Sequence, residues 1–453
     1  DMDNVRNIHF VGVGGVSMRA LARFCAARGI LVSGSDDAAG IDLEDLKRSG
    51  VHILPSDCTD FIGECDMVVF SAAIPYFHPQ LAAARAQHIP TLERKAFLGL
   101  LSKKFDKTVA VSGTHGKTTV TAMLCEIFSL AGMSFTGHIG GAVKGNTGGI
   151  VSCGNEWFVT EACEYNRSFL TLSPYVTAVL NLQFDHPDCY RDMDDMVAAY
   201  DALIANTSKD GCIVCSATAE RMLNLTGRRV VTFGYTRGAD IYPEEVKYSG
   251  GRYSFFLAKC GVKRAFVEMK VEGKHNIANC LAAYAVAGEC GISDDICACA
   301  LSAFCGVKGR YEHKGKTAGG ASVVYDYAHH PGEIEAAIAT ARQSCKKRVV
   351  AVFEPHTFSR TRALMKEFIS ALSLADEVIV LPAYKAREEY TPSGSGYDLY
   401  RRLAVLGNTR ASYAADYKKA AELALGKTSA GDILLVMGAG TVWRVADMVS
   451  NYI

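Results

Sequence analysis

The sequence lacks an excess of charge of either sign, and it lacks any long apolar run. Its 453 residues include 48 lysines and arginines and 48 aspartates and glutamates, a balance that argues against nucleic acid as the main partner. No stretch of about 18 apolar residues predicts a membrane span. The first ten residues also lack the basic start and apolar core of a signal peptide. We therefore expect a cytoplasmic protein with small-molecule partners, present as a monomer or a homodimer.

A disulfide framework is also missing, although the chain has 16 cysteines. They are scattered through apolar segments, where a free thiol behaves as a small hydrophobic side chain. Cys212 and Cys215 form a CxxC pair, but no second pair stands at the spacing of a zinc site. Their segment alternates like a strand, which would place the two thiols on opposite faces of a sheet. We expect structural thiols in a reducing compartment.

The chain is too long for one hydrophobic core, and its strand and helix signals alternate. This alternation predicts parallel sheets with helices on both faces. We expect three α/β domains, over residues 1–106, 107–310 and 311–453. The strand signals are 8–13, 31–35, 66–71, 108–112, 157–160, 177–182, 211–215, 322–325, 348–353, 377–381 and 432–437, and helix signals include 17–28, 42–49, 117–131 and 276–290.

A phosphate-binding loop is predicted between the strand that ends at Ser112 and the helix that follows. A bound triphosphate needs converging backbone N–H groups, a helix N-terminus, a lysine on the β and γ oxygens and a hydroxyl on Mg²⁺. The strict motif has glycine where Val111 stands, but the strand–loop–helix context is right. The predicted ATP-binding residues of this loop are Gly113, Thr114, His115, Gly116, Lys117, Thr118 and Thr119.

A second glycine-rich loop lies near the N-terminus, between a predicted strand and helix. Gly12, Gly14, Gly15 and Ser17 form a variant of the GxGxxG motif, and Asp36 follows at the end of the next strand, where a ribose contact would lie. The motif fits a nicotinamide cofactor. Any nucleotide diphosphate fits the same helix terminus, however, and a tight turn without a ligand is a third interpretation.

Acidic and imidazole groups follow two strands of the central domain. Glu161 and Glu164 end one strand, and Asn181, Asp185 and His186 end another. Because such strand ends lie beside the phosphate loop, they are where the magnesium of a nucleotide site would be held. Solvated acidic loop ends are the alternative interpretation.

The third domain has two similar segments at the ends of adjacent strands. One runs over residues 326–331 and contains Asp326, Tyr327 and His330, and the other runs over residues 354–362 and contains His356 and Arg360. Clustered imidazole and guanidinium groups favour binding of an anionic substrate or transition state.

Taken together, these residues resemble the Mur ligase family, and most closely its branch that joins L-alanine to UDP-N-acetylmuramate. The likeness runs through nearly the whole chain, and the segment 354–362 is typical of the alanine-adding branch. Further matching segments are 161–170, 181–186, 273–279, 309–311 and 326–331.

The resemblance implies three domains: a Rossmann-like UDP-substrate domain, a central ATPase domain with a mainly parallel sheet, and a Rossmann-like C-terminal domain that closes on the amino acid. It implies ATP and Mg²⁺ as cofactors. The implied metal ligands are Thr118, Glu161 and His186, and the implied catalytic residues are Lys117, His186, His356 and Arg360. Further ATP-binding residues would be Asn276, Asn279, Arg310 and Asp326. The UDP-substrate would contact Gly12, Gly14, Gly15, Asp36, Ser71, Tyr327 and His330.

Some positions differ from the usual family pattern, namely Ser17, Cys163, Gly309, Gly332 and Thr357. Three other functions are alternatives. A sister ligase attaches a recycled tripeptide to the same sugar nucleotide. A nicotinamide-dependent oxidoreductase would leave the loop at Lys117 unused. An inert nucleotide-binding scaffold would leave the metal candidates unused as well.

Overall fold

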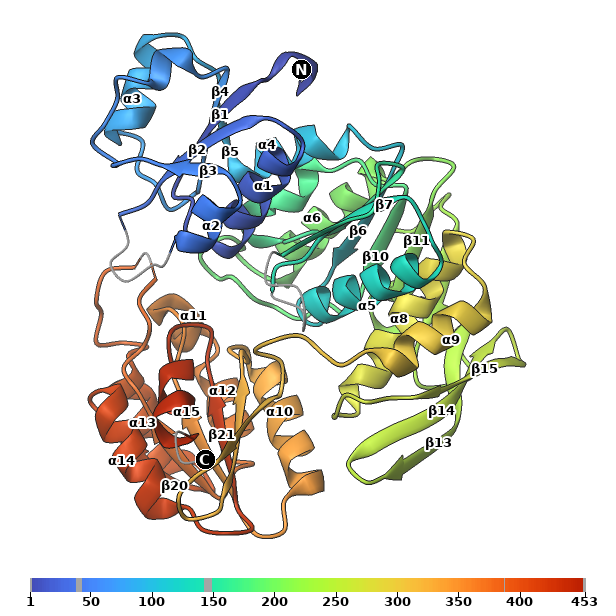
Figure 1. Cartoon of the computed structure of the whole chain (residues 1–453). Helices are drawn as coiled ribbons and strands as arrows, with labels where there is room; N and C mark the ends of the chain where they lie inside the picture. Colours follow the sequence, from blue (N-terminus) through green and yellow to red (C-terminus); the bar gives the residue numbers. More distant parts are fainter. Residues whose placement is uncertain (1, 38–42, 142–148, 387, 451–453) are drawn as a thin grey trace.

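The structure is a computed structural model that describes residues 2–37, 43–141, 149–386 and 388–450. Three successive α/β domains are built around separate sheets, and Figure 1 shows them in blue, in teal to yellow and in orange to red. The predicted fold class is confirmed. The domain boundaries near residues 106 and 310 stay predictions.

The N-terminal sheet is parallel throughout and has the order β3-β2-β1-β4-β5. Its elements are β1 (Asn7–Val11), α1 (Val16–Ala27), β2 (Leu31–Ser35), α2 (Glu44–Arg48), β3 (Val51–Ile53), β4 (Met67–Phe70), α3 (Pro79–Ala86), β5 (Thr91–Glu93) and α4 (Arg94–Ser102), with 3-10 turns η1 (Met2–Asn4) and η2 (Ile62–Glu64). The chain order reverses between β1 and β4, and such a switch point is where open α/β sheets bind ligands.

The central sheet has the order β15-β14-β13-β12-β11-β10-β6-β9-β7-β8. Its strands are parallel from β13 to β7, whereas β8 and the β13–β14–β15 hairpins pair antiparallel. The elements are β6 (Lys107–Ser112), α5 (Lys117–Leu130), β7 (Phe135–His138), β8 (Ile150–Ser152), β9 (Trp157–Glu161), η3 (Tyr165–Thr171), β10 (Val176–Val179), α6 (Met193–Asn206), β11 (Cys212–Ser216), α7 (Ala217–Glu220), β12 (Val230–Phe233), β13 (Ile241–Ser249), β14 (Arg252–Lys259), β15 (Val262–Glu268), α8 (His275–Glu289) and α9 (Asp294–Ala303).

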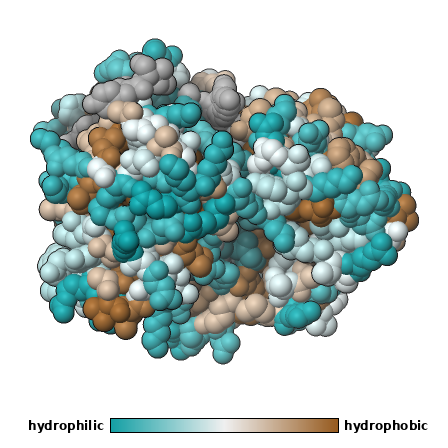
Figure 2. Space-filling view, turned by 90° about the horizontal axis from the view of Figure 1, so that it is seen from below, coloured by the Kyte–Doolittle hydropathy of each residue, from teal (hydrophilic) through white to brown (hydrophobic). Residues whose placement is uncertain are grey.

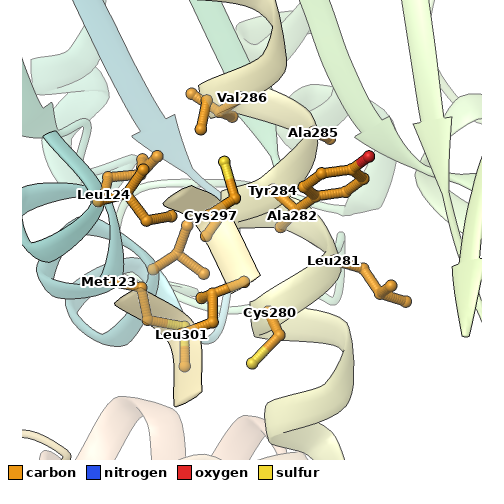
Figure 3. Packing of buried hydrophobic residues seen from close by; sticks show 14 of the residues in the cluster. Met123, Leu124, Cys280, Leu281, Ala282, Tyr284, Ala285, Val286, Cys297 and Leu301 are labelled. Atoms are coloured by element: carbon orange, nitrogen blue, oxygen red, sulfur yellow. The ribbon is translucent and has the colours of Figure 1, made fainter. Parts of the chain in front are cut away.

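Small residues let α8 pack closely against its neighbours, as its alanine-rich sequence predicts. In Figure 3, Met123 and Leu124 of α5 lie beside Leu301 of α9, with α8 running along the other side of the cluster. Cys212 belongs to this core, whereas Cys215 belongs to the core on the opposite face of the sheet. The predicted opposite orientation of the two thiols is therefore confirmed.

The C-terminal sheet has the order β16-β17-β21-β18-β19-β20, and only β16 among its described strands pairs antiparallel. Its inner strands are continuous apolar runs such as VVAVF and ILLVM, as burial on both faces requires. The elements are β16 (Glu312–Lys316), β17 (Ser322–Asp326), α10 (Pro331–Ser344), β18 (Val349–Phe353), α11 (Phe358–Ala363), α12 (Met365–Leu372), β19 (Glu377–Val380), α13 (Gly396–Leu406), β20 (Arg410–Tyr413), α14 (Tyr417–Lys427), β21 (Ile433–Met437) and α15 (Trp443–Ser450).

The face of the molecule that is seen in Figure 2 carries both polar and apolar residues. Figure 2, seen from below, shows a hollow near the middle of that face, with hydrophilic and hydrophobic residues around it. Within the described ranges, every helix is too short or too polar to cross a membrane.

Candidate active site

The loop between β6 and α5 has the shape that a phosphate-binding loop requires. Gly113 and Gly116 have φ angles of 135° and 85°, in the region that favours glycine. A Cβ at Gly113 would lie 3.1 Å from the backbone nitrogen of Asn181, and one at Gly116 would lie 2.6 Å from Asn279 Oδ1. Asn181 also accepts a hydrogen bond from the backbone N–H of His115 and donates one to its carbonyl, at 2.8 and 3.0 Å. The end of β10 therefore fixes the loop.

Lys117, at the start of α5, is held inside this loop by a buried carboxylate. Its Nζ lies 3.0 Å from Glu164 Oε2, and the Glu164 side chain is only 1% exposed. Nζ also donates to the carbonyl of Thr114 at 3.2 Å. Burial lowers the pKa of Lys117, but the surrounding acidic groups, Glu164 foremost, raise it, and the net shift is upward. The ammonium therefore stays charged where phosphate oxygens would lie.

Thr118 and Glu161 form one potential set of metal ligands beside Lys117. Glu161 ends β9 and accepts hydrogen bonds from the Thr118 hydroxyl and, at 2.5 Å, from the backbone N–H of Gly140. Burial raises the pKa of Glu161 despite these bonds and the nearby charge of Lys117. A carboxylate beside a threonine hydroxyl suits Mg²⁺, which prefers oxygen ligands.

Glu164, Asp185 and His186 form a second set, with ligand atoms all within 4.8 Å of one another. His186 Nε2 lies 3.5 Å from Glu164 Oε1, so both groups border Lys117. His186 has a φ of 56°, and its backbone N–H donates to Asp185 Oδ1 at 2.7 Å. A histidine in this backbone region costs roughly 1–3 kcal/mol, and such strain concentrates at functional sites.

Glu161 and Glu164 were both predicted as magnesium candidates from their place at one strand end, whereas the resemblance implied Glu161 alone as a ligand. The turn after β9 decides which one faces Lys117, and the structure turns Glu164 toward both Lys117 and His186. Both carboxylates border the loop.

Arg360, on α11 of the C-terminal domain, reaches the metal candidates of the central domain. Its Nε donates to Asp185 Oδ1 at 2.7 Å and its Nη2 to Asp185 Oδ2 at 3.4 Å, with both side chains about 95% buried. Arg360 also lies 3.1 Å from His356 Nδ1 and 3.3 Å from His186 Nδ1. The four predicted catalytic residues Lys117, His186, His356 and Arg360 thus lie around one point.

The charges of this cluster are set by burial and by the guanidinium. Burial raises the pKa of Asp185, but His186 and Arg360 lower it more strongly, and the net shift is far below the usual range. Burial, with help from Arg360, lowers the pKa of His356 to about 4. Asp185 is therefore ionised and His356 neutral at physiological pH. The hydrogen bonds to Asp185 hold the Arg360 guanidinium in one orientation.

A cavity of about 590 Å³ opens between the central and C-terminal domains, next to the phosphate loop. Its volume suits a small-molecule ligand. Of the predicted ATP-binding residues, it is lined by His115, Gly116, Thr119, Asn276, Asn279, Arg310 and Asp326. The lining residues that were not predicted include Tyr235, His275 and Glu333.

Asp326 lies on the C-terminal-domain side of this cavity and is half-buried. It accepts hydrogen bonds from the backbone N–H groups of Tyr311 and Ala328, at 2.9 and 2.7 Å. Burial raises its pKa to about 6, against the opposing charge of Arg310. Arg310 also lies 3.5 Å from Glu333, so the cavity wall combines both signs of charge.

The first glycine-rich loop lies at the switch point of the N-terminal sheet. Gly12 has a φ of 79°, and a Cβ there would lie 3.2 Å from the side chain of Ser71. The backbone N–H of Gly14 donates to Asp36 Oδ2 at 2.7 Å, so this carboxylate also holds the loop in place. Gly12, Gly14, Gly15, Asp36 and Ser71 therefore form one local group.

Tyr327 and His330 were predicted by resemblance to contact the UDP-substrate, and the structure places both between β17 and α10, in the C-terminal domain. The guanidinium of Arg310 lies 5.1 Å from the Tyr327 ring centre. His330 Nε2 donates to the carbonyl of Phe184 at 3.1 Å, and its Nδ1 accepts from the backbone N–H of Gly332 at 3.3 Å. His330 thus joins α10 to the central domain, and Tyr327 lies beside Arg310, which lines the cavity.

Three domain descriptions of one family match the chain in succession. They are "Mur ligase family, catalytic domain" over residues 7–106, "Mur ligase middle domain" over residues 111–287, and "Mur ligase, glutamate ligase domain" over residues 309–440. Together they cover most of the chain.

Individual proteins of this family are similar to the chain over nearly their full length. The chain is 35% identical to a UDP-N-acetylmuramate–L-alanine ligase of Acetivibrio thermocellus, over 99% of this chain and 96% of the relative. The crystal structure of a UDP-N-acetylmuramate–alanine ligase from Thermotoga maritima has a TM-score of 0.80 at 26% identity, with 98% of each chain covered. A murein peptide ligase from Psychrobacter arcticus shares the fold, with a TM-score of 0.73 at 23% identity and 99% coverage of each chain. The chain belongs to the Mur ligase family.

Proposed function

We propose that this chain joins L-alanine to UDP-N-acetylmuramate at the expense of ATP, in the synthesis of peptidoglycan precursors. The observation that carries the proposal is the meeting of Lys117, Glu164, His186 and Arg360 from two domains beside one nucleotide-sized cavity. The full-length likeness to ligases of that name supports the choice of substrates.

In the first step, a carboxylate oxygen of the sugar acid attacks the γ-phosphorus of ATP, giving an acyl phosphate and ADP. Since both reactants are anionic, charge compensation is the main requirement. Lys117 would neutralise charge that develops on the γ-phosphate. Thr118, Glu161, Glu164 and His186 would hold Mg²⁺, which supplies further positive charge at the phosphate oxygens when bound.

In the second step, the neutral amine of alanine attacks the acyl carbon, and phosphate leaves from the tetrahedral adduct, carrying away the proton that the nitrogen loses. Asp185 accepts hydrogen bonds from Nε and Nη2 of Arg360, and Nη1 is directed at His356. The guanidinium held in this way is suited to stabilise the anionic oxygens of the acyl phosphate and of the tetrahedral adduct. Neutral His356 can accept or donate a hydrogen bond there without adding charge.

The glycine-rich loop of the N-terminal domain would take the diphosphate of the UDP-substrate at the start of α1. ATP would occupy the cavity along Asn276, Asn279, Arg310 and Asp326. We place this reaction in the cytoplasm, where ATP is made, and expect a monomer or a homodimer.

The test is to incubate the protein with ATP, Mg²⁺ and UDP-N-acetylmuramate, adding either L-alanine or the recycled tripeptide, and to measure phosphate release and product mass. Release with alanine and a product heavier by one alanyl residue are expected. Release with the tripeptide alone would select the sister ligase. Binding of reduced nicotinamide without ATP turnover would select the oxidoreductase, and no turnover with any acceptor would leave an inert scaffold.

A further inference from the structure

A chain of hydrogen bonds crosses from the N-terminal domain to the central domain at Ser17. Ser17 lies in the first turn of α1, directly after the glycine-rich loop, in a place where the motif has glycine. Its Oγ lies 3.0 Å from Nε2 of His138, which ends β7 of the central sheet. His138 Nδ1 lies 3.1 Å from Oγ1 of Thr160 on β9, the residue paired with it in the sheet.

The direction of each bond in this chain follows from its two ends. At one end, Arg94 Nη1 donates to Ser17 Oγ at 3.3 Å, so the Ser17 hydroxyl hydrogen is free to point at His138 Nε2. At the other end, Thr160 Oγ1 donates to the carbonyl of Glu161 at 3.1 Å, so it accepts from His138 Nδ1. His138 is therefore a neutral imidazole with its proton on Nδ1.

Burial supports the same protonation state. His138 is 3% exposed and Thr160 is fully buried. Burial, together with the charge of Arg94, lowers the pKa of His138 to about 3. The imidazole thus stays neutral throughout the physiological range, and both of its nitrogens have a partner.

The series of hydrogen bonds that starts at Ser17 ends at the proposed metal site. Thr160 precedes Glu161, whose carbonyl it holds, and Gly140, two residues after His138, donates its N–H to the Glu161 carboxylate. The two domains also touch directly here, because a Cβ at Gly149 would lie 3.2 Å from the Cβ of Ala20 on α1. Gly140 after β7 therefore contacts Glu161, and Gly149 before β8 lies against the helix that follows the glycine-rich loop.

We infer that Ser17, His138 and Thr160 form a relay that couples occupancy of the glycine-rich loop to the placement of Glu161, with His138 as its central positioning residue. The inference rests on the proposed function, because it takes the UDP-substrate as the ligand of the loop and Mg²⁺–ATP as the ligand beside Glu161. A ligand that fixes one end of the relay favours the geometry of the other end, so each ligand tightens the binding of the other by the same factor.

The first experiment reads the proton directly. In ¹⁵N-histidine NMR spectra, the imidazole signals that disappear in His138→Leu belong to His138. They are expected to show a neutral ring protonated on Nδ1 and unprotonated on Nε2. A ring protonated on Nε2, or a charged ring, would overturn the relay.

The second experiment measures the coupling. Calorimetric titration gives the Kd of UDP-N-acetylmuramate with and without Mg²⁺ and a non-hydrolysable ATP analogue, and the ratio of the two is the coupling factor. We expect a factor of about 5 or more in the original chain. In Ser17→Ala and His138→Leu it should fall to within roughly twofold of unity, while Ser17→Thr, which keeps the hydroxyl, should retain it.

The matched control is His52→Leu, which removes an exposed histidine of the N-terminal sheet and should leave the factor unchanged. An unchanged factor in His138→Leu, or no coupling in the original chain, would overturn the inference. If neither ligand binds the original chain, the proposed function itself fails, and thermal unfolding of each variant separates loss of coupling from loss of fold.

Discussion

Arg360 of the C-terminal domain grips Asp185 of the central domain with two hydrogen bonds, and water reaches hardly any of either side chain. A buried ion pair is costly to break on one side only, because the remaining charge is left without compensation. The pair therefore fixes the C-terminal domain against the metal candidates at one defined point.

Arg360→Met should loosen this domain contact and nearly abolish ligation. An uncompensated buried charge costs about 3–5 kcal/mol, and loss of a transition-state donor lowers kcat by about 10²–10³-fold. Hydrogen exchange should speed up over residues 183–188 and 356–362. The control Glu422→Gln breaks an exposed pair with Lys419 and should change neither measurement. Unchanged exchange in Arg360→Met would contradict the role of the pair.

Lys117→Ala should stop ADP formation while UDP-N-acetylmuramate still binds. The Lys117 ammonium lies in the phosphate loop, whereas the glycine-rich loop belongs to another domain. The substitution therefore removes a positive charge from the proposed ATP site and leaves the proposed UDP-substrate site intact. We expect at least a roughly 10²-fold fall in turnover and a Kd for the UDP-substrate within about twofold. Exposed Lys209 of the same domain provides the control Lys209→Ala. Loss of both properties together would indicate misfolding or a wrongly assigned N-terminal domain.

Glu161→Gln and Glu164→Gln should each weaken metal binding, since each replaces a carboxylate ligand by a neutral amide. Mn²⁺ titration followed by electron paramagnetic resonance, in the presence of the ATP analogue, is expected to show affinities lower by about 10–100-fold. The exposed Glu156 gives the control Glu156→Gln. If Glu164→Gln binds Mn²⁺ normally, the second set of ligands at His186 is not a metal site.

Asp326 should make the chain more stable as the pH falls from 7 to 4. Its pKa is raised from 3.8 to about 6 by burial, so the folded protein binds this proton more tightly than the unfolded chain does. The shift corresponds to about 3 kcal/mol of added stability. This stabilisation is absent at pH values above the folded pKa and complete at pH values below the unfolded pKa. Denaturant unfolding of Asp326→Asn across this range should lack that gain, and parallel pH profiles of the two proteins would refute the shift.

Much of the catalytic centre could be predicted because it depends on local sequence. The loop before Lys117 needs glycines at defined φ angles, and parallel strands bring their carboxyl ends to one edge, so Glu161 and His186 were predicted to lie near Lys117. The role of Arg360 in the same reaction came from the resemblance. The strands that pass through the middle of each sheet were found for a similar reason, since burial on both faces makes them continuous apolar runs.

The remaining features depend on contacts that no short segment contains. The hairpins β13 to β15 were missed because they are largely exposed on one face, and polar residues such as those of IYPEEVKYS hide the strand signal. The partner of Asp185 could not be found either, since Arg360 lies 175 residues away in another domain.

Cys212 and Cys215 point to opposite faces of the sheet, so this CxxC sequence cannot act like the redox and zinc-binding motifs that have the same spacing. A rigid, hydrogen-bonded sheet stands between the two sulfur atoms, and each is packed in its own hydrophobic core. Diamide cannot link them and chelators have no shared ion to remove, so neither reagent should alter the folding of this strand.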